Sequence, residues 1–212
     1  MKILLLGGNG ELGPHVVKAL EKMHTLRITD INNLQTDHEY IKVDSSDLDQ
    51  VVRAAENMDA IINLSVLRPD RKLAFDVNAR GCYNMMIAAR EHGIRRLINT
   101  GPFYAVTGPT YERFDHGIHV DVPHQPGTYL YALTKSLGQE ICTVMAPEQD
   151  AYVMDLLFYM FVDVETDKAE SGSPIANLGN DLVPYTVSWR DAADAFRLAM
   201  DCLLYTSDAA DE

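Results

Sequence analysis

The sequence predicts an α/β domain, a doubly wound parallel sheet with helices on both faces. Short apolar runs alternate with longer amphipathic stretches along most of its 212 residues, and a glycine-rich turn joins the first run to the first amphipathic stretch. Strands that alternate with helices need crossover connections, which make neighbouring strands parallel. The right-handed crossover rule then leaves a doubly wound sheet as the simplest topology.

The amino-terminal elements follow this alternation. Ile3–Leu6 is an apolar run, as expected for a strand that is buried on both faces. Glu11–Met23 repeats apolar residues at helical spacing, which predicts an amphipathic helix. Two short strands are expected at Leu26–Thr29 and Tyr40–Val43, followed by a helix at Asp47–Asn57.

The middle of the chain holds the longest expected helix. Ala60–Leu64 is a continuous apolar strand, and Asp70–Glu91 is a long helical stretch that stops before Gly93. Arg96–Asn99 is the next strand. Residues 100–128 are rich in proline and glycine, which predicts a loop.

The last elements complete the pattern. Tyr129–Met145 is an expected helix that stops before Pro147, because proline lacks the N–H that a helix interior needs. Ala151–Phe158 and Leu182–Val187 are expected strands, and Trp189–Met200 is an amphipathic helix.

The composition restricts the partners. With 18 basic and 31 acidic residues the formal net charge is −13, which repels nucleic-acid phosphates and anionic membranes. We therefore expect neither as a partner. The three cysteines show no CxxC pairing and indicate a reducing compartment, the cytoplasm. The apolar amino-terminal run is too short for a signal peptide or a membrane span.

Histidines and carboxylates gather between residues 114 and 127 of the expected loop. Their spacing matches no standard metal site, so we expect no metal. This stretch is interpreted as a polar surface loop or as the rim of a substrate pocket.

The glycine-rich turn GGNGELG has the spacing of a phosphate-binding loop. Gly7 allows a tight turn, Gly10 lets the backbone approach a pyrophosphate, and Gly13 lets the helix pack close to the strand. The helix start around Glu11 and Leu12 offers N–H groups and a partial positive charge to the phosphates. The turn predicts a Rossmann-type dinucleotide site; a glycine-rich turn without a ligand is the alternative.

Two acids at strand ends could contact the adenosine half of a dinucleotide. Asp30 closes the second strand, where a carboxylate accepts hydrogen bonds from ribose hydroxyls and repels the 2′-phosphate of NADP. We therefore predict NAD as the cofactor. Asp44 follows the third strand and could approach the adenine edge. Exposed or helix-capping acids are the alternative interpretations.

Several stretches of residues 1–201 resemble the extended short-chain dehydrogenase/reductase family, the NAD-dependent epimerase/dehydratase group. The glycine turn is similar to the family's cofactor loop, and Asn63–Val66 is similar to the segment that lines the cofactor after the fourth strand. Asn78 and Gly81 resemble the family's Asn-x-x-Gly stretch. The resemblance implies cofactor contacts from Leu64, Ser65 and Asn78.

The same resemblance covers Tyr131 and Lys135, which match the family's Tyr-x-x-x-Lys motif. The two lie one turn apart on one face of an expected helix, so the ammonium can sit beside the phenol and favour its ionised form. The resemblance implies that Tyr131 is the general acid or base and that Lys135 also binds the nicotinamide ribose. An ordinary exposed helix pair is the alternative.

The chain departs from the family in two places. The family usually has a catalytic Ser or Thr where our alignment places Pro102, which has no hydroxyl. Thr100 could supply that hydroxyl if the loop is shifted, or it could only pack at the strand end. The family's substrate-binding stretch is replaced by Phe158–Val162, so nucleotide-sugar specificity does not follow.

Family members usually extend well beyond this chain. We therefore expect residues 1–201 to form the NAD-binding domain, with a partial substrate lobe at about 158–182 and most of that lobe missing. Residues 202–212 resemble a translated sequencing adapter and indicate a non-native tail. A genuine polar tail is the alternative.

The combined prediction is an NAD-dependent oxidoreductase or epimerase/dehydratase that acts on a secondary alcohol or carbonyl. A sugar or nucleotide sugar is the small-molecule substrate that the family implies. The alternative is a non-catalytic dinucleotide-binding sensor, which Pro102 favours, and the truncated chain could also be inactive. The resemblance further implies a homodimer through the two long helices.

Overall fold

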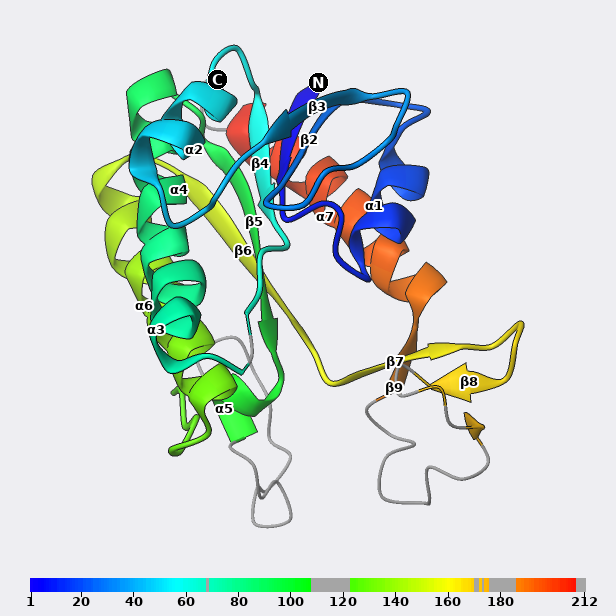
Figure 1. Ribbon diagram of the computed structural model, residues 1–212. Helices are drawn as coiled ribbons and strands as arrows, with labels where there is room; N and C mark the ends of the chain where they lie inside the picture. Colours follow the sequence, from blue (N-terminus) through cyan, green and yellow to red (C-terminus); the bar gives the residue numbers. More distant parts are fainter. Residues whose placement is uncertain (68, 108–122, 170–171, 173, 176–185, 209–212) are drawn as a thin grey trace.

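A computed structural model describes residues 1–67, 69–107, 123–169, 172, 174–175 and 186–208. Its centre is a six-stranded sheet in the order β3-β2-β1-β4-β5-β6 (Figure 1). The strands are β1 Lys2–Leu6, β2 Thr25–Asp30, β3 Glu39–Lys42, β4 Ala60–Asn63, β5 Arg96–Pro102 and β6 Tyr152–Phe158. Every neighbouring pair is parallel, which confirms the predicted doubly wound sheet. The strand order reverses between β1 and β4, where such sheets bind ligands.

Helices cover both faces of the sheet (Figure 1). One face carries α1 and α7, and the other carries α2, α4 and α6. Their bounds are α1 Gly13–Leu20, α2 Leu48–Ala55, α4 Gly81–His92, α6 Leu130–Glu148 and α7 Trp189–Asp208. Successive residues of β1 alternate between two cores: Ile3 and Leu5 pack with α1 and α7, whereas Leu4 and Leu6 pack with α2 and α4. This two-sided burial explains why the strands lack polar alternation.

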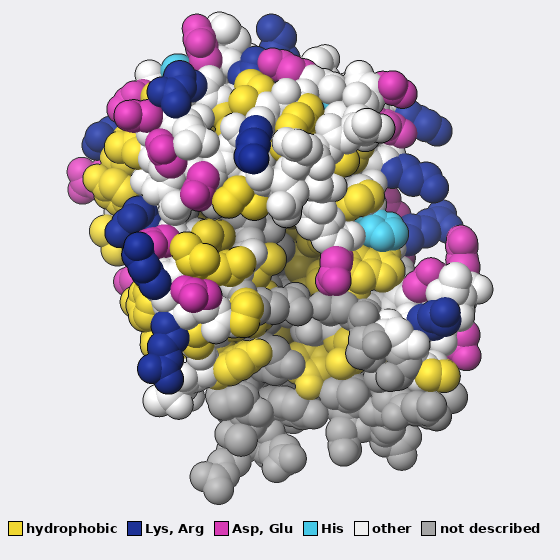
Figure 2. Space-filling view, viewed as in Figure 1, with side chains coloured by type: hydrophobic (Ala, Val, Ile, Leu, Met, Phe, Trp, Pro, Cys, Tyr) yellow, Lys and Arg dark blue, Asp and Glu magenta, His cyan; other side chains and the backbone are white. Residues whose placement is uncertain are grey.

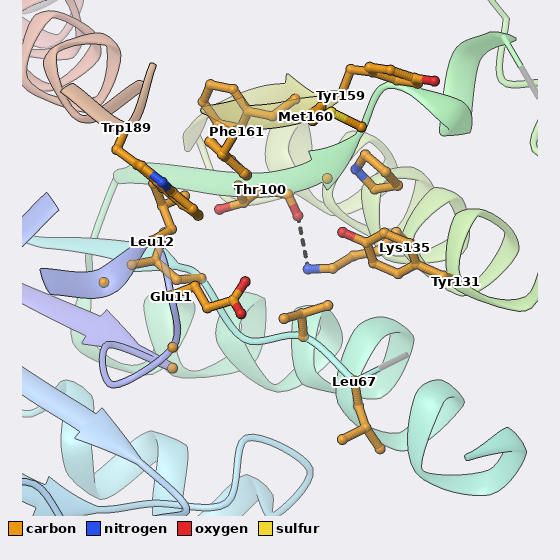
Figure 3. A pocket seen from close by; sticks show the side chains of 18 of the residues that line it. Glu11, Leu12, Leu67, Thr100, Tyr131, Lys135, Tyr159, Met160, Phe161 and Trp189 are labelled. Carbon is orange, nitrogen blue, oxygen red and sulfur yellow. Dashed lines mark hydrogen bonds between the residues drawn. The ribbon is translucent and has the colours of Figure 1, made fainter. Parts of the chain in front are cut away.

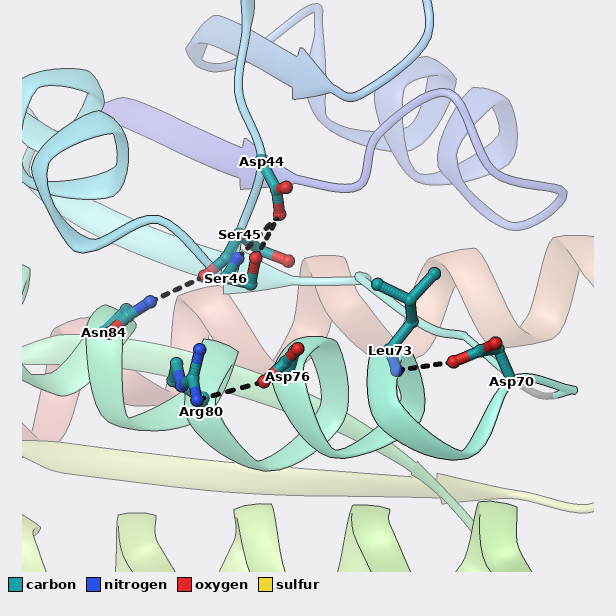
Figure 4. A network of polar contacts seen from close by, with 8 residues as sticks. All are labelled: Asp44, Ser45, Ser46, Asp70, Leu73, Asp76, Arg80 and Asn84. Atoms are coloured by element: carbon teal, nitrogen blue, oxygen red, sulfur yellow. Dashed lines mark hydrogen bonds and ion pairs between the residues drawn. The ribbon is translucent and has the colours of Figure 1, made fainter.

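The expected helix Asp70–Glu91 consists of three consecutive helical segments. α3 (Arg71–Ala74) begins after Asp70, whose carboxylate accepts a hydrogen bond from the Leu73 N–H at 2.8 Å (Figure 4). The π-helical segment η1 (Phe75–Arg80) follows and leads into α4. Gly93 ends α4 with a φ of 66°, the left-handed conformation that glycine adopts without strain.

Several predicted boundaries were wrong, among them those of β5, α6 and α7. β5 continues to Pro102 and is followed by α5 (Tyr104–Thr107), where a loop was expected; residues 108–122 lie outside the described part. α6 continues through Pro147, because only one hydrogen bond near the helix end is lost there. α7 runs beyond Met200 to Asp208.

A second, smaller sheet follows β6. Its strands are β7 Met160–Asp163, β8 Lys168–Ala169 and β9 Thr186–Ser188, in the order β8-β7-β9. β9 covers the described end of the strand expected at Leu182–Val187, and residues 182–185 lie outside the described part. This sheet lies beyond the carboxyl end of β6, in the region predicted as a partial substrate lobe (Figure 1). That lobe and the non-native tail stay predictions.

Close contact between α6 and the helix that contains Asn78 gives a stability prediction. A methyl group at Gly138 would lie 2.3 Å from the Asn78 carbonyl oxygen and 2.7 Å from Cys82 Sγ. Gly138→Ala should therefore lower the free energy of unfolding by about 1–3 kcal/mol, the usual cost of overpacking. Urea denaturation measures the change, and Glu140→Ala, at an exposed position of the same helix, is the control. Equal unfolding midpoints for Gly138→Ala and the unmutated protein would contradict this contact.

Candidate active site

A cavity of about 770 Å³ opens at the carboxyl ends of β1, β4 and β5. Figure 2 shows a hollow in the middle of the face that is in view, with hydrophobic side chains on its walls. Among the predicted site residues, those that line the cavity are Gly7, Gly10, Glu11, Leu12, Gly13, Leu64, Thr100, Tyr131 and Lys135. The predicted glycine turn and the predicted Tyr–Lys pair therefore share one cavity.

The glycine turn forms a close backbone cradle on the floor of this cavity. Gly7 has a φ of +72°, and a Cβ atom there would lie 2.7 Å from the backbone of Ser65. A Cβ atom at Gly13 would lie 2.0 Å from the carbonyl oxygen of Gly8. Only glycine fits these two positions, because any side chain would push β4 or α1 away from the turn.

The start of α1 suits an anionic group. Leu12 stands at the N-cap position and its side chain makes no capping hydrogen bond, and Pro14 follows in the first turn. A helix that begins in this way presents N–H groups and a partial positive charge at its amino end. Together with the cradle, this start fits the pyrophosphate of a dinucleotide. The Glu11 side chain points into the cavity (Figure 3).

Asp30 lies at the end of β2, next to the glycine turn but not on the cavity wall. Its carboxylate accepts hydrogen bonds from the N–H groups of Asn9 at 3.2 Å and Asn32 at 2.9 Å. The phenol of Tyr40 donates to the Asp30 carbonyl oxygen. Burial and the negative charge of Asp30 raise the pKa of Tyr40, so this phenol stays protonated and keeps donating. These bonds fix the acid where an adenosine ribose is expected.

Lys135 is the charged residue at the centre of the site. Its side chain is only 2% exposed, and its ammonium donates to the carbonyl oxygens of Ser65 at 2.7 Å and Thr100 at 2.9 Å. Figure 3 shows the side chains of Tyr131 and Lys135 both directed into the cavity. Their joint action on one bound group stays a prediction.

Thr100 lines the cavity at the end of β5, but its hydroxyl donates to the carbonyl oxygen of Asn63. The hydroxyl proton is thus directed at β4, and its role as a substrate donor stays a prediction. Pro102, which our alignment places at the position of a family hydroxyl, also lines the cavity.

Three predicted residues face other partners. The Asn78 side chain is fully buried and bonds the Leu67 backbone and the Thr134 hydroxyl. Ser65 contributes its backbone to the site through the bond from Lys135. The Asp44 carboxylate accepts from Ser46, within its own turn (Figure 4). Direct contact of these residues with a cofactor stays a prediction.

An aromatic wall, formed by Phe158, Phe161 and Trp189, was not predicted as part of the site. All three line the cavity, and the rings of Trp189 and Phe161 stack with centroids 4.3 Å apart and an angle of 5°. On its other side, Trp189 stacks on His15 of α1 at 5.1 Å. The aromatic run after the sixth strand and the single tryptophan were the available signals, but only the fold brings them together.

A buried polar network lies behind the cavity, between the sheet and α4 and α6. Asn99 Nδ2 donates to the carboxylate of Asp155 at 2.8 Å. Burial raises the pKa of Asp155, while the bond from Asn99 and the positive charges of His124 and Lys135 partly oppose this shift. Asp155 therefore keeps its proton to a higher pH than an exposed aspartate does.

Within the described ranges, no cluster of three or more His, Cys, Asp or Glu side chains could hold a metal ion. His124 bonds the Ser136 hydroxyl, and the other histidines and acids of the 114–122 stretch lie outside the described residues. No helix in the described part of the chain combines the length and apolarity needed to cross a bilayer.

The fold, the glycine cradle and the Tyr–Lys pair define a dinucleotide-binding α/β domain of the dehydrogenase/reductase type. The chain belongs to the NAD dependent epimerase/dehydratase family, whose model matches residues 3–162. The predicted family and its cofactor, NAD, are thereby confirmed.

The relatives include sugar-acid dehydrogenases. A uronate dehydrogenase of Pseudomonas syringae pv. tomato is 31% identical over 150 residues, which cover 67% of this chain and 53% of that protein. A short-chain dehydrogenase/reductase superfamily protein from Agrobacterium tumefaciens, solved with bound NAD, is 26% identical with a TM-score of 0.70, covering 77% of this chain and 50% of that one. The uronate dehydrogenase from Agrobacterium tumefaciens shares the fold: TM-score 0.76, 20% identity, 92% of this chain and 70% of that one. The chain spans about half the length of the curated relatives it matches.

The raised pKa of Asp155 gives a pH-dependent stability. Because the folded protein holds this proton more tightly than the unfolded chain does, unfolding becomes easier as the pH rises from about 4, where a free aspartate ionises. Asp155→Asn, which cannot ionise, should make the free energy of unfolding fall less steeply with pH. Urea denaturation at a series of pH values measures this slope.

The control residue is Asp163, whose pKa is shifted in the opposite direction to that of Asp155. Hydrogen bonds from Thr166 and from the Glu165 N–H lower the pKa of Asp163, which is partly exposed. The stability that Asp163 contributes is present above the pKa of a free aspartate and is lost as the pH falls, so Asp163→Asn should remove it at the higher pH values. Identical slopes for Asp155→Asn and the unmutated protein would show that Asp155 does not cause the effect.

Proposed function

We propose that this chain is the cofactor-binding and catalytic part of an NAD-dependent oxidoreductase that acts on a secondary alcohol or carbonyl of a sugar. The observation that supports it most directly is the shared cavity: Tyr131 and Lys135 point into the same space that begins at the glycine cradle. A dinucleotide whose pyrophosphate lies on the cradle would extend toward this pair along the strand ends.

The residues suggest a division of roles. When bound, NAD supplies the carbon that accepts or donates a hydride. Tyr131 exchanges a proton with the oxygen of the substrate alcohol or carbonyl, so that the O–H bond breaks or forms as the hydride leaves or joins the carbon, and only the carbon of the substrate changes oxidation state. Lys135 is held by two backbone carbonyls and brings a positive charge into the same cavity as Tyr131, where it would orient the cofactor and substrate around the phenol. In an epimerase, the reverse reaction would return the hydride to either face of the substrate carbonyl carbon.

A sugar is proposed as the substrate on two grounds. Matched relatives are named as uronate dehydrogenases. The cavity also combines the apolar faces of Phe161 and Trp189 with the polar Tyr131, and a sugar ring has both C–H faces and hydroxyl edges. The choice between a free sugar acid, another sugar and a nucleotide sugar is left to experiment.

The oligomer and the compartment are proposals of the same kind. Exposed apolar side chains at Tyr83 of α4 and at Leu137 and Val144 of α6 support a homodimer through these helices. The buried thiols of Cys82 and Cys142 are compatible with a reducing cytoplasm.

A non-catalytic dinucleotide sensor is the second candidate. Pro102 at the usual hydroxyl position and the Thr100 hydroxyl bonded to Asn63 both favour it, because neither offers a proton to a substrate oxygen. Turnover that depends on the Tyr131 hydroxyl would distinguish the enzyme from the sensor.

The first test is cofactor choice. NAD should bind more tightly than NADP, and Asp30→Ala should weaken NAD binding about tenfold, as the loss of charged hydrogen bonds predicts, while NADP binding holds or rises. Isothermal titration calorimetry measures both affinities. Asp37→Ala, which removes an exposed charge from the following loop, is the control. Equal affinities for the two cofactors in the unmutated chain would refute this role of Asp30.

The second test is turnover by the full-length protein. Tyr131→Phe removes the proton-transferring hydroxyl and should lower kcat by about 10²–10⁴, with NAD affinity nearly unchanged. Oxidation of sugar acids, followed by NADH absorbance, is the assay. Tyr83→Phe, on the outer face of α4, is the matched control. Unchanged turnover would remove Tyr131 from the mechanism, and NAD binding without turnover of any sugar would favour the sensor.

A further inference from the structure

A row of polar side chains crosses three strands of the main sheet directly behind the cavity. Asn63 of β4, Asn99 of β5 and Asp155 of β6 stand at the same register. Asn63 Nδ2 donates to Asn99 Oδ1 at 3.0 Å, and Asn99 Nδ2 donates to Asp155 Oδ1 at 2.8 Å. Asn63 and Asn99 are buried, and Asn63 also contacts Cys82 of α4, so the row faces the helices.

The preceding layer on this face is entirely apolar. Ile61, Leu97 and Val153 are paired in the same way across the three strands and belong to the core beneath α4 and α6. Buried strands of parallel sheets are normally apolar, and polar groups in that position cost free energy unless they are hydrogen-bonded. The polar row therefore replaces a favourable apolar layer only at the level where the cavity begins.

The hydrogen bonds of the row have one direction. The Asp155 oxygen accepts from Asn99, so the Asn99 amide presents its NH₂ group to β6 and its oxygen to Asn63. Asn63 then turns its own oxygen away from β5, and this oxygen accepts from the Ser65 N–H at 3.1 Å. The row thus ends on the backbone of Ser65.

Ser65 connects the row to the site. Its carbonyl oxygen accepts the Lys135 ammonium at 2.7 Å, and the Thr100 hydroxyl fixes the Asn63 carbonyl. We propose that Asp155 is a positioning residue: through Asn99 and Asn63 it orients the Ser65 backbone and thereby places the Lys135 ammonium at the cavity. The proposal rests on the proposed function only for the role of Lys135, because the chain of contacts from Asp155 to Ser65 is independent of any cofactor.

Three single variants test the proposal in the full chain. Asp155→Val has a similar size but accepts no hydrogen bond, so the Asn99 amide loses its orienting partner. Asp155→Asn keeps an acceptor oxygen and should restore the row. Val153→Ala removes apolar packing from the same face of the same strand and is the matched control.

The first readout is amide hydrogen exchange, which needs no cofactor. Asp155→Val should speed exchange of the 63–67 segment about tenfold beyond any change in global stability. Asp155→Asn and Val153→Ala should stay within about threefold of the unmutated protein. The second readout is NAD affinity by calorimetry, where Asp155→Val should raise Kd about tenfold and Asp155→Asn should restore it.

A second variant covers the case in which Asp155→Val does not fold. The double substitution Asn99→Val with Asp155→Val extends the apolar layer and removes the middle and the end of the row together, so that no Asn99 amide is left without its acceptor. Asn63 then keeps its contact with Cys82 Sγ and the bond from the Ser65 N–H. The double variant should also speed amide hydrogen exchange of the 63–67 segment.

Several outcomes would overturn the proposal. The first is unchanged hydrogen exchange of residues 63–67 in Asp155→Val. The second is that Val153→Ala speeds this exchange as much as Asp155→Val does. The third is that exchange in Asp155→Asn is as fast as in Asp155→Val. An unchanged segment with new aggregation would instead assign Asp155 to protecting the edge strand β6. If the unmutated chain binds no NAD, the proposed function fails, but the exchange data still decide the positioning role.

Discussion

The buried ammonium of Lys135 is the interaction on which the site depends. It joins the carboxyl ends of β4 and β5 by donating to the carbonyl oxygens of Ser65 and Thr100. Two strand ends, one helix and the neighbouring Tyr131 are thereby held in one arrangement. A buried cation is costly unless its hydrogen bonds are satisfied, so the surrounding backbone must be placed accurately. The polar row behind the cavity is proposed to help place this backbone.

The glycine cradle imposes the matching constraint at the other end of the cavity. Gly7 brings β1 against Ser65, the residue that also accepts the Lys135 ammonium. One residue, Ser65, therefore borders both the proposed phosphate site and the Tyr–Lys pair. A shift of this residue would affect both ends of a bound dinucleotide.

The sequence predicted the parts of the site that depend on local spacing. The order of strands and helices, the glycine turn and the turn that separates Tyr131 from Lys135 all follow from periodicity and motif, and the structure brings them to one cavity. Contacts that depend on register and side-chain direction could not be predicted. Asn78 turns toward Leu67, and the row from Asn63 to Asp155 exists only because three strands pair at one level.

The stack of His15, Trp189 and Phe161 has a practical consequence. Trp189 is the single tryptophan of the chain, and its indole forms part of the cavity wall. Its intrinsic emission therefore comes from one known position in the wall of the cavity. The protein carries its own optical reporter, so occupation of the cavity can be followed in solution without attaching a label.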